Sequence, residues 1–347
     1  MKNLVVGLFS LLVLFSCTNS GESNGTSGDQ AQEINVYTHR HYESDQELFK
    51  LFEEKTGIKV NVINASADEL IQKMSMEGRQ SPADVLITVD AGRLERAKSM
   101  ELLQPIESEV LGGTIPAHLR DPENHWFALT KRARVVAYAK DRVRPEELST
   151  YEDLATEKWR GKLLTRSSEN IYNQSLMAAM VVNLGDEQAK AWAEGIVRNM
   201  ARTPKGSDRD QVKAVVGGEG DLAIVNSYYI GQLLNSSDPE EVKVGEQVGV
   251  FFPDQDGRGT HINVSGAGVA KYAPNKDNAV RFIEFLISEE AQVIFARGNF
   301  EYPVNAAVAP AELLQGWGEF KEDTLNLAEL GQNNKKAVML LDEANWK

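Results

Sequence analysis

The fold is decided by residues 34–70, which read INVYTHRHYESDQELFKLFEEKTGIKVNVINASADEL. The short stretches 34–38 and 59–64 are apolar and β-rich, as expected for strands. Between them, apolar side chains recur at helical spacing, and Ser44 and Glu47 match a capping box at the start of that helix. This segment therefore predicts a strand, a helix and a second strand.

The same alternation continues beyond this segment. Ser66 and Glu69 form a second candidate capping box, which opens a helix. A continuous apolar strand is expected at 84–89, and a third helix at 91–100. Strands that alternate with helices favour parallel pairing with right-handed crossovers, so we expect a doubly wound α/β lobe.

A second α/β region follows the first. Further strands are expected at 134–140, 162–165, 221–226, 249–252 and 266–270, and further helices at 170–184, 187–200, 208–216, 279–287 and within 310–347. No linker separates the two regions, so we expect a two-lobed periplasmic-binding-protein fold of type II whose strands cross between lobes. The first lobe would take 33–133 and about 260–309, and the second 134–259 and about 310–347. Ligands in such folds bind in the crevice between lobes.

Composition narrows the class of partner. The 347 residues carry 51 acidic and 37 basic side chains, a formal net charge of −14. This balance argues against nucleic acid and anionic membrane surfaces. It is compatible with a cationic ligand, and equally with a soluble protein kept dispersed by its charge.

The N-terminus has the features of an export signal. Lys2 precedes an apolar run of signal-peptide length, 4–15, which is too short to span a bilayer. Cys17, the single cysteine, follows a small residue as in the lipobox of bacterial lipoproteins. We expect a signal peptide at 1–16 and a lipidated Cys17 that begins a flexible tether, 17–32, in the cell envelope. An ordinary signal with a chance cysteine is the alternative.

Four segments are polar or aromatic where loops or helix starts are expected. They are His39–Tyr42, Asn170–Gln174, Asn226–Tyr229 and Asp254–Gly259. Three of them contain tyrosine. A phenol has a pKa near 10, but a high-charge cation stabilises the phenolate, a hard anionic oxygen that suits Fe(III). Zinc would require more Cys or His, and calcium would require convergent carboxylates. Most tyrosines are structural, and the pair Tyr228–Tyr229 alone does not exclude that reading.

Residues 34–347 as a whole resemble a known family. The segments that carry the resemblance are VYTHRHY (36–42), SPADVL (81–86), KRAR (131–134), SENIYNQS (168–175) and DLAIVNSYY (221–229). They are similar to the ferric-iron substrate-binding proteins of ABC transporters, most of all to the cyanobacterial Fut-type branch. The resemblance implies a monomeric receptor, here in lipoprotein form, that captures ferric iron and passes it to a membrane permease.

The resemblance also implies the ligands. It assigns phenolate ligands to Tyr42, Tyr172, Tyr228 and Tyr229, and a weaker ligand to His41. The better-known ferric-binding proteins use a glutamate with a bound phosphate, and Val89 stands at the glutamate position here. We therefore expect that no additional anion is obligatory. Two arginines, Arg40 and Arg132, are expected either to pair with the phenolate oxygens of the ligands or to lie at the solvated surface.

Two alternatives follow from the same fold class. A receptor for a polyamine, thiamine or a small anion would have a cleft of carboxylates or stacking aromatic rings. A lipid-anchored hydrolase would need a nucleophile with a base in reach, and no motif supplies one, so we expect no enzymatic activity.

Overall fold

One mixed sheet runs through the part of the chain that the computed structural model describes, residues 32–347. Its strands are β1 (Glu33–Thr38), β2 (Lys59–Asn64), β3 (Val85–Val89), β4 (Phe127–Ala139), β5 (Leu163–Leu164), β6 (Leu222–Asn226), β7 (Val248–Phe251), β8 (Ile262–Val269) and β9 (Tyr302–Pro303). Their order is β2-β1-β3-β8-β4-β6-β5, with β7 and β9 paired to β4. The expected signal peptide and Cys17 lie outside the described residues and stay predictions.

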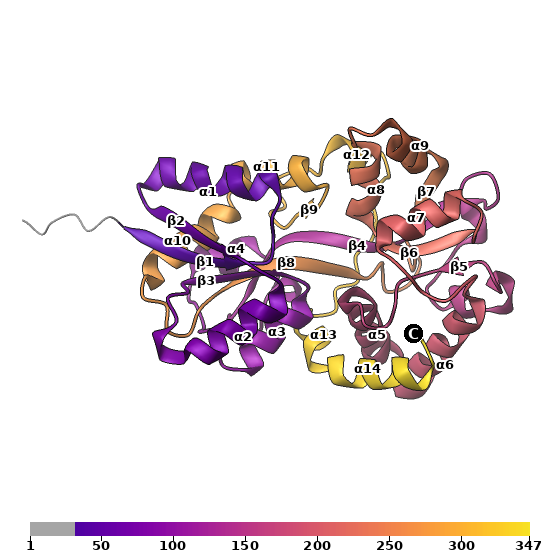
Figure 1. The fold of residues 1–347 in the computed structure, drawn as a ribbon, viewed down its shortest axis with the longest axis horizontal. Helices are drawn as coiled ribbons and strands as arrows, with labels where there is room; N and C mark the ends of the chain where they lie inside the picture. The colour runs from indigo at the N-terminus through magenta and orange to yellow at the C-terminus, as the bar shows by residue number, and fades with distance from the viewer. Residues whose placement is uncertain (1–31) are drawn as a thin grey trace, which may run out of the picture. The chain divides into compact units, whose positions relative to one another are not determined.

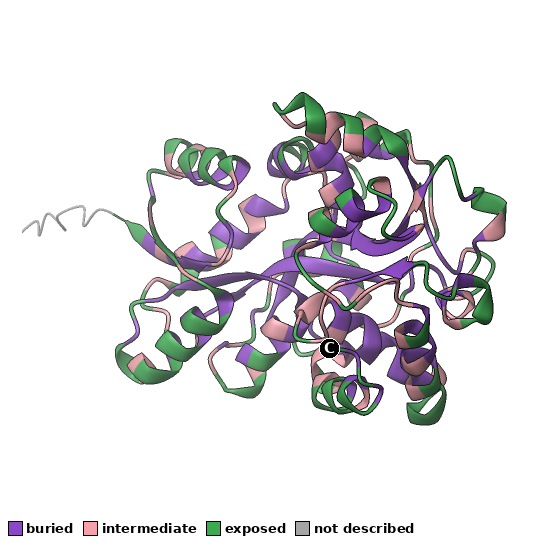
Figure 2. Ribbon diagram, turned by 45° about the vertical axis from the view of Figure 1, so that its right-hand side comes forward, coloured by how far each residue is buried: buried purple, intermediate pink, exposed green. Residues whose placement is uncertain are grey.

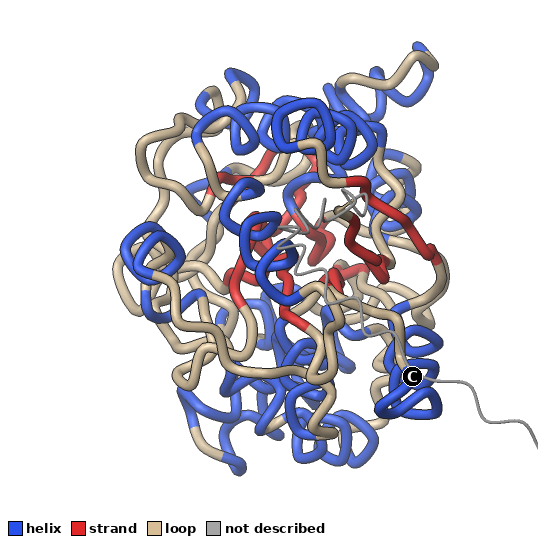
Figure 3. Tube along the Cα trace, turned by 90° about the vertical axis from the view of Figure 1, so that its left-hand side faces the viewer, coloured by secondary structure: helices blue, strands red, loops and turns tan. Residues whose placement is uncertain are grey.

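Helices surround this sheet, and Figure 3 shows the strands in the middle of the molecule with helices around them. The helices are α1 (Glu43–Thr56), α2 (Ala67–Glu77), α3 (Ala91–Ser99), α4 (Glu109–Thr114), α5 (Ile171–Leu184), α6 (Asp186–Asn199), α7 (Asp208–Val216), α8 (Ser227–Leu234), α9 (Pro239–Gln247), α10 (Lys276–Leu286), α11 (Glu289–Asn299), α12 (Glu312–Gln315), α13 (Ala328–Gln332) and α14 (Asn334–Glu343). Figure 2 shows that the central strands are buried along most of their length. The expected α/β architecture is confirmed.

The first three strands pair as the sequence predicts. Strand β1 lies between β2 and β3 and is parallel to both. The capping box at Ser66 is also present, because its hydroxyl accepts from the Glu69 amide and the Glu69 carboxylate accepts from the Ser66 amide.

Strand β4 joins two halves of the sheet, and in Figure 1 it runs lengthwise through the middle beside β8. Up to Ala133 it pairs with β8, which in turn pairs with β3. From Arg134 onward it pairs with β6 and β7. We call β1, β2, β3, β8, β9 and the start of β4 the first half of the sheet, and β5, β6, β7 and the end of β4 the second half. Helix α13 packs on both α3 and α5.

Two predictions of local structure are wrong. The predicted strand at 134–140 begins seven residues earlier, at Phe127, because Arg132 and Arg134 are buried ion-pair partners within the strand rather than its solvated boundary. The predicted capping box at Ser44 is absent. The first helix begins at Glu43, and the Ser44 hydroxyl instead forms a hydrogen bond of 3.0 Å with the side-chain amide of Asn299.

Within residues 32–347, no helix has both the length and the apolar character needed to cross a bilayer.

Candidate metal centre

Tyr42 lies at the N-terminus of α1, in the loop that follows β1. Its carbonyl accepts from the amide of Asp45, so the residue caps the helix through its backbone. The Arg40 guanidinium carbon lies 4.9 Å from the centre of the Tyr42 ring, and the exposed His41 ring stacks on Tyr42 with centroids 5.6 Å apart. Tyr42 is thus held by its own loop at the end of the first strand.

Tyr172 lies in the first turn of α5. Asn170 caps this helix, because its side-chain oxygen accepts from the Tyr172 amide at 3.1 Å. Three guanidinium carbons surround the Tyr172 ring: those of Arg132, Arg134 and Arg166 lie 5.6, 5.9 and 5.8 Å from its centre. The Tyr172 ring is therefore surrounded by the positive charge of three arginines.

Tyr228 and Tyr229 lie in the first turn of α8, directly after β6. Their rings are 4.2 Å apart and inclined by 33°. The Tyr228 hydroxyl lies 3.4 Å from that of Tyr172, a contact that joins α8 to α5. Only 5% of Tyr228 is exposed.

The four predicted tyrosines therefore meet in one place. Tyr42 comes from the first half of the sheet and the other three from helices of the second half. Tyr42 and Tyr172 are each close enough to Tyr228 and Tyr229 to raise their pKa values. Each tyrosine stands at the N-terminus of a helix, where the backbone amides and the helix dipole favour negative charge. Four phenol side chains thus lie close together at the N-termini of three helices.

Without a cation, these phenols are hard to ionise. Burial, and then the negative Glu301, raise the pKa of Tyr42 to about 12. Burial, and then the neighbouring tyrosines, raise the pKa of Tyr228 and Tyr229 well above the usual range. At neutral pH the three groups are therefore protonated.

A buried network connects the tyrosines of the two halves. Arg40 pairs with Asp45 at 3.0 Å and with Glu301 at 2.9 Å, and Arg132 lies 3.5 Å from Glu301. The hydroxyl of Ser265 accepts from both arginines, at 2.6 and 3.0 Å, and donates to Glu301. Arg40 is 3% and Arg132 1% exposed, so the alternative of a solvated surface role is wrong for both.

A second buried pair supports Tyr172 from the other side. Arg134 donates to Asp208 at 2.7 Å and to the side chain of Asn173 at 2.7 Å. Asp208 also accepts from the backbone amide of Asn226, next to the paired tyrosines. Asp208 and Glu301 were not predicted, since a lone acidic residue at a helix start or before a short strand carries no sequence signal. Arg134 was named only as part of the KRAR segment, without a role in the site.

Comparison with known proteins decides the family. Residues 37–293 match the family described as bacterial extracellular solute-binding protein. The chain belongs to this family. This solute-binding protein is 52% identical to iron uptake protein A1 of Synechocystis sp. over 96% of its own length and 93% of that protein.

Solved structures show the same fold. A Trichodesmium protein called IdiA or FutA, solved in complex with iron and citrate, is 53% identical, with a TM-score of 0.89 over 91% of this chain and all of that one. A ferric binding protein from Campylobacter jejuni is 45% identical, with a TM-score of 0.85 over 90% of this chain and all of that one. The two-lobed fold and the resemblance to ferric-binding proteins are thus confirmed.

The solute-binding protein has one cluster of acidic and histidine side chains with metal-like spacing among residues 32–347: Asp121, Glu123 and His125. The Lys98 ammonium already occupies its centre, 2.7 Å from Asp121 and 2.8 Å from Glu123. The imidazole Nδ1 of His125 donates to the Asp121 carboxylate at 2.8 Å. This cluster is an ion-pair network and does not compete with the tyrosines as a metal site.

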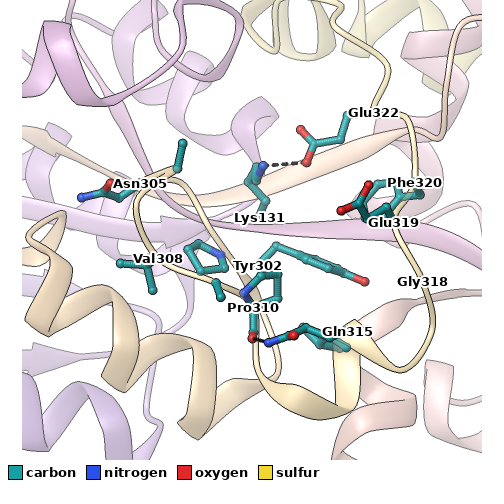
Figure 4. A pocket seen from close by; sticks show the side chains of 14 residues that line it. Lys131, Tyr302, Asn305, Val308, Pro310, Gln315, Gly318, Glu319, Phe320 and Glu322 are labelled. Carbon is teal, nitrogen blue, oxygen red and sulfur yellow. Dashed lines mark hydrogen bonds and ion pairs between the residues drawn. The ribbon is translucent and has the colours of Figure 1, made fainter.

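A hollow of about 610 Å³ lies away from the tyrosines, against β9 and the segment that follows it. Figure 4 shows the Lys131–Glu322 ion pair on one side and Tyr302 and Gln315 on another. None of the predicted ligands lines it. The volume of this hollow is therefore no evidence for or against a ligand at the tyrosine cluster.

Proposed function

We propose that this protein captures Fe(III) through the phenolate oxygens of Tyr42, Tyr172, Tyr228 and Tyr229. The observation that carries the proposal is that four phenols meet at the N-termini of three helices that come from both halves of the sheet. Relatives named as iron uptake and ferric binding proteins support it.

The charges around the cluster favour a trivalent ion. Three buried guanidinium groups, those of Arg40, Arg132 and Arg134, are matched by three buried carboxylates, those of Asp45, Glu301 and Asp208. These buried groups are together close to neutral, and the partly exposed Arg166 beside Tyr172 adds one positive charge. Four phenolates leave one surplus negative charge around Fe(III) and two around a divalent ion, and surplus charge in a buried site is costly.

Several finer features follow from the proposal. His41 stacks on Tyr42 at the exposed edge of the cluster, where it is a weaker candidate for a further ligand. The position after the third strand, Val89, offers no oxygen. Two buried donors of Arg132, Nε and Nη2, have no partner among residues 32–347 and are available to ligand oxygens. We infer that no additional anion is obligatory.

The two halves of the sheet would act as lobes, with the boundaries expected from the sequence. An ion held by Tyr42 on one lobe and by three tyrosines on the other draws the lobes together. We infer a monomeric receptor without enzymatic activity, held outside the cytoplasm by a lipid on Cys17, which delivers iron to an ABC permease.

The proposal is tested by equilibrium dialysis of the purified protein against Fe(III) citrate at neutral pH. One tightly held iron per chain is expected, together with visible colour from phenolate-to-iron charge transfer. Spermidine, thiamine and phosphate should not displace it. A protein that retains no iron, or that binds one of these solutes in its place, would show that the assignment is wrong.

The pKa values predict that affinity depends on pH. Because the pKa values of Tyr42, Tyr228 and Tyr229 are raised in the iron-free protein, each of these phenols must release a proton when it binds the ion. Affinity should therefore fall as pH falls, by about tenfold per pH unit for each phenol that ionises. Competition against citrate between pH 8 and 6, corrected for citrate protonation and ferric hydrolysis, measures this slope. A corrected affinity that does not change with pH contradicts it.

A further inference from the structure

A buried carboxylate lies at the end of β3, one residue after Val89. Asp90 has a backbone φ of 79°, in the left-handed region that a residue with a side chain rarely adopts, and it is fully buried. Its carboxylate accepts from the Gly92 amide, from Asn263 Nδ2 and from the Ser175 hydroxyl, each at 2.8 Å. A strained backbone and a buried charge are both costly, and they persist where the surrounding structure fixes them, often at ligand clamps.

The contact to Ser175 crosses from the first half of the sheet to a helix of the second half. Asp90 follows β3, and its partner Asn263 belongs to β8. Ser175 lies in α5, one turn after Tyr172. The Ser175 hydroxyl is shared between both carboxylate oxygens of Asp90, at 2.8 and 2.9 Å. Any movement of α5 away from β3 must break this contact.

The Asp90 carboxylate is closely packed on the side of Gly92. A Cβ atom at Gly92 would lie 3.1 Å from Asp90 Oδ1, 3.8 Å from Ser175 Oγ and 3.9 Å from the backbone of Gly331 in α13. Helices α3, α5 and α13 thus pack closely around the carboxylate. Ser175 itself is fully buried, so no water can take its place in this arrangement.

We propose that Asp90 is a positioning residue for the metal. Through Ser175 it fixes the first turn of α5 against the end of β3, and so holds the Tyr172 hydroxyl near Tyr42 and Tyr228. This rests on the proposed function. The carboxylate at this strand end does not face the tyrosine cluster; it locks the helix that carries one of the ligands.

The test uses the iron-loaded full chain and measures how fast a chelator such as EDTA removes Fe(III). Ser175→Ala removes one hydrogen bond to a charged group, which predicts release about tenfold faster than wild type. The charge-transfer band should keep its position, because all four phenols remain. Asp90→Asn, which keeps the shape of the side chain, should accelerate release in the same direction.

Ser81→Ala is the matched control. Ser81 also donates to a carboxylate, that of Glu77 at 2.8 Å, but both residues belong to the first half of the sheet. Ser81→Ala should leave the release rate unchanged. Because Glu77 is only partly buried, this variant should lower the free energy of unfolding less than Ser175→Ala does. The proposal is overturned if Ser175→Ala releases iron at the wild-type rate, or if Ser81→Ala accelerates iron release as much as Ser175→Ala does. A wild-type protein that takes up no iron at all contradicts the proposed function instead.

Discussion

Replacing Tyr228 by Phe is expected to weaken Fe(III) binding by more than ~100-fold. Losing a group that only hydrogen-bonds to a metal ligand costs up to ~100-fold in affinity, and the loss of a ligand itself should cost more. Tyr228 is buried between Tyr229 and Tyr172, and its hydroxyl lies 3.4 Å from that of Tyr172. Phe keeps the ring packing and removes only the oxygen. Competition titration with Fe(III) citrate measures the affinity, and the visible band should weaken and shift at the same time.

Tyr302→Phe is the control for this substitution. Tyr302 is also buried, but its hydroxyl has no hydrogen-bond partner among residues 32–347, and it lies on β9 away from the cluster. Its loss should leave iron affinity unchanged and should not lower stability, because it removes a buried polar group without a partner. Equal affinities in Tyr228→Phe and Tyr302→Phe would exclude Tyr228 as a ligand.

Replacing Glu301 by Gln is expected to destabilise the iron-free protein by about 3 kcal/mol, since one partner of a buried ion pair is lost and the other stays buried. Burial raises the pKa of Glu301, but Arg40 and then Arg132 outweigh it and hold the pKa below its usual value. The carboxylate is therefore ionised at neutral pH and balances two guanidinium groups. Urea unfolding of the iron-free variant at pH 7 measures the change in free energy.

Glu343→Ala provides the comparison. Glu343 pairs with Lys190 at 2.7 Å, but the two side chains are 48% and 39% exposed, so the loss of Glu343 should cost far less than the loss of Glu301. If Glu301→Gln is no more destabilising than Glu343→Ala, the buried network does not support the cluster as described.

Much of the fold could be predicted because local pattern and tertiary structure agree. The apolar strands that end at Thr38 and Asn226, and the helix that follows Thr38, are found where the spacing places them. The helix after Asn226, α8, was not predicted. The errors occur where a tertiary contact overrides the local signal. Ser44 has the spacing of a capping residue, yet packing against α11 draws its hydroxyl to Asn299.

The site was only partly accessible from the sequence. Tyr42 and Tyr172 lie at predicted helix starts and the pair Tyr228–Tyr229 directly after a predicted strand, so their convergence could be anticipated once the family resemblance was added. The buried ion pairs next to these tyrosines could not be anticipated, because Glu301 lies 261 positions from Arg40 and no local pattern links the two. Arg132 and Arg134 alternate along a strand, which indicates a shared face, but the sequence left Arg132 either next to the ligands or at the surface and gave Arg134 no role in the site.

The most direct test of the central claim is resonance Raman spectroscopy of the Fe(III)-loaded protein, excited within its visible absorption band. If phenolates hold the ion, the spectrum shows tyrosinate ring modes that shift when the protein is made with ring-deuterated tyrosine, and that lose intensity in Tyr228→Phe. A protein that binds Fe(III) tightly without these modes would contradict coordination by tyrosine.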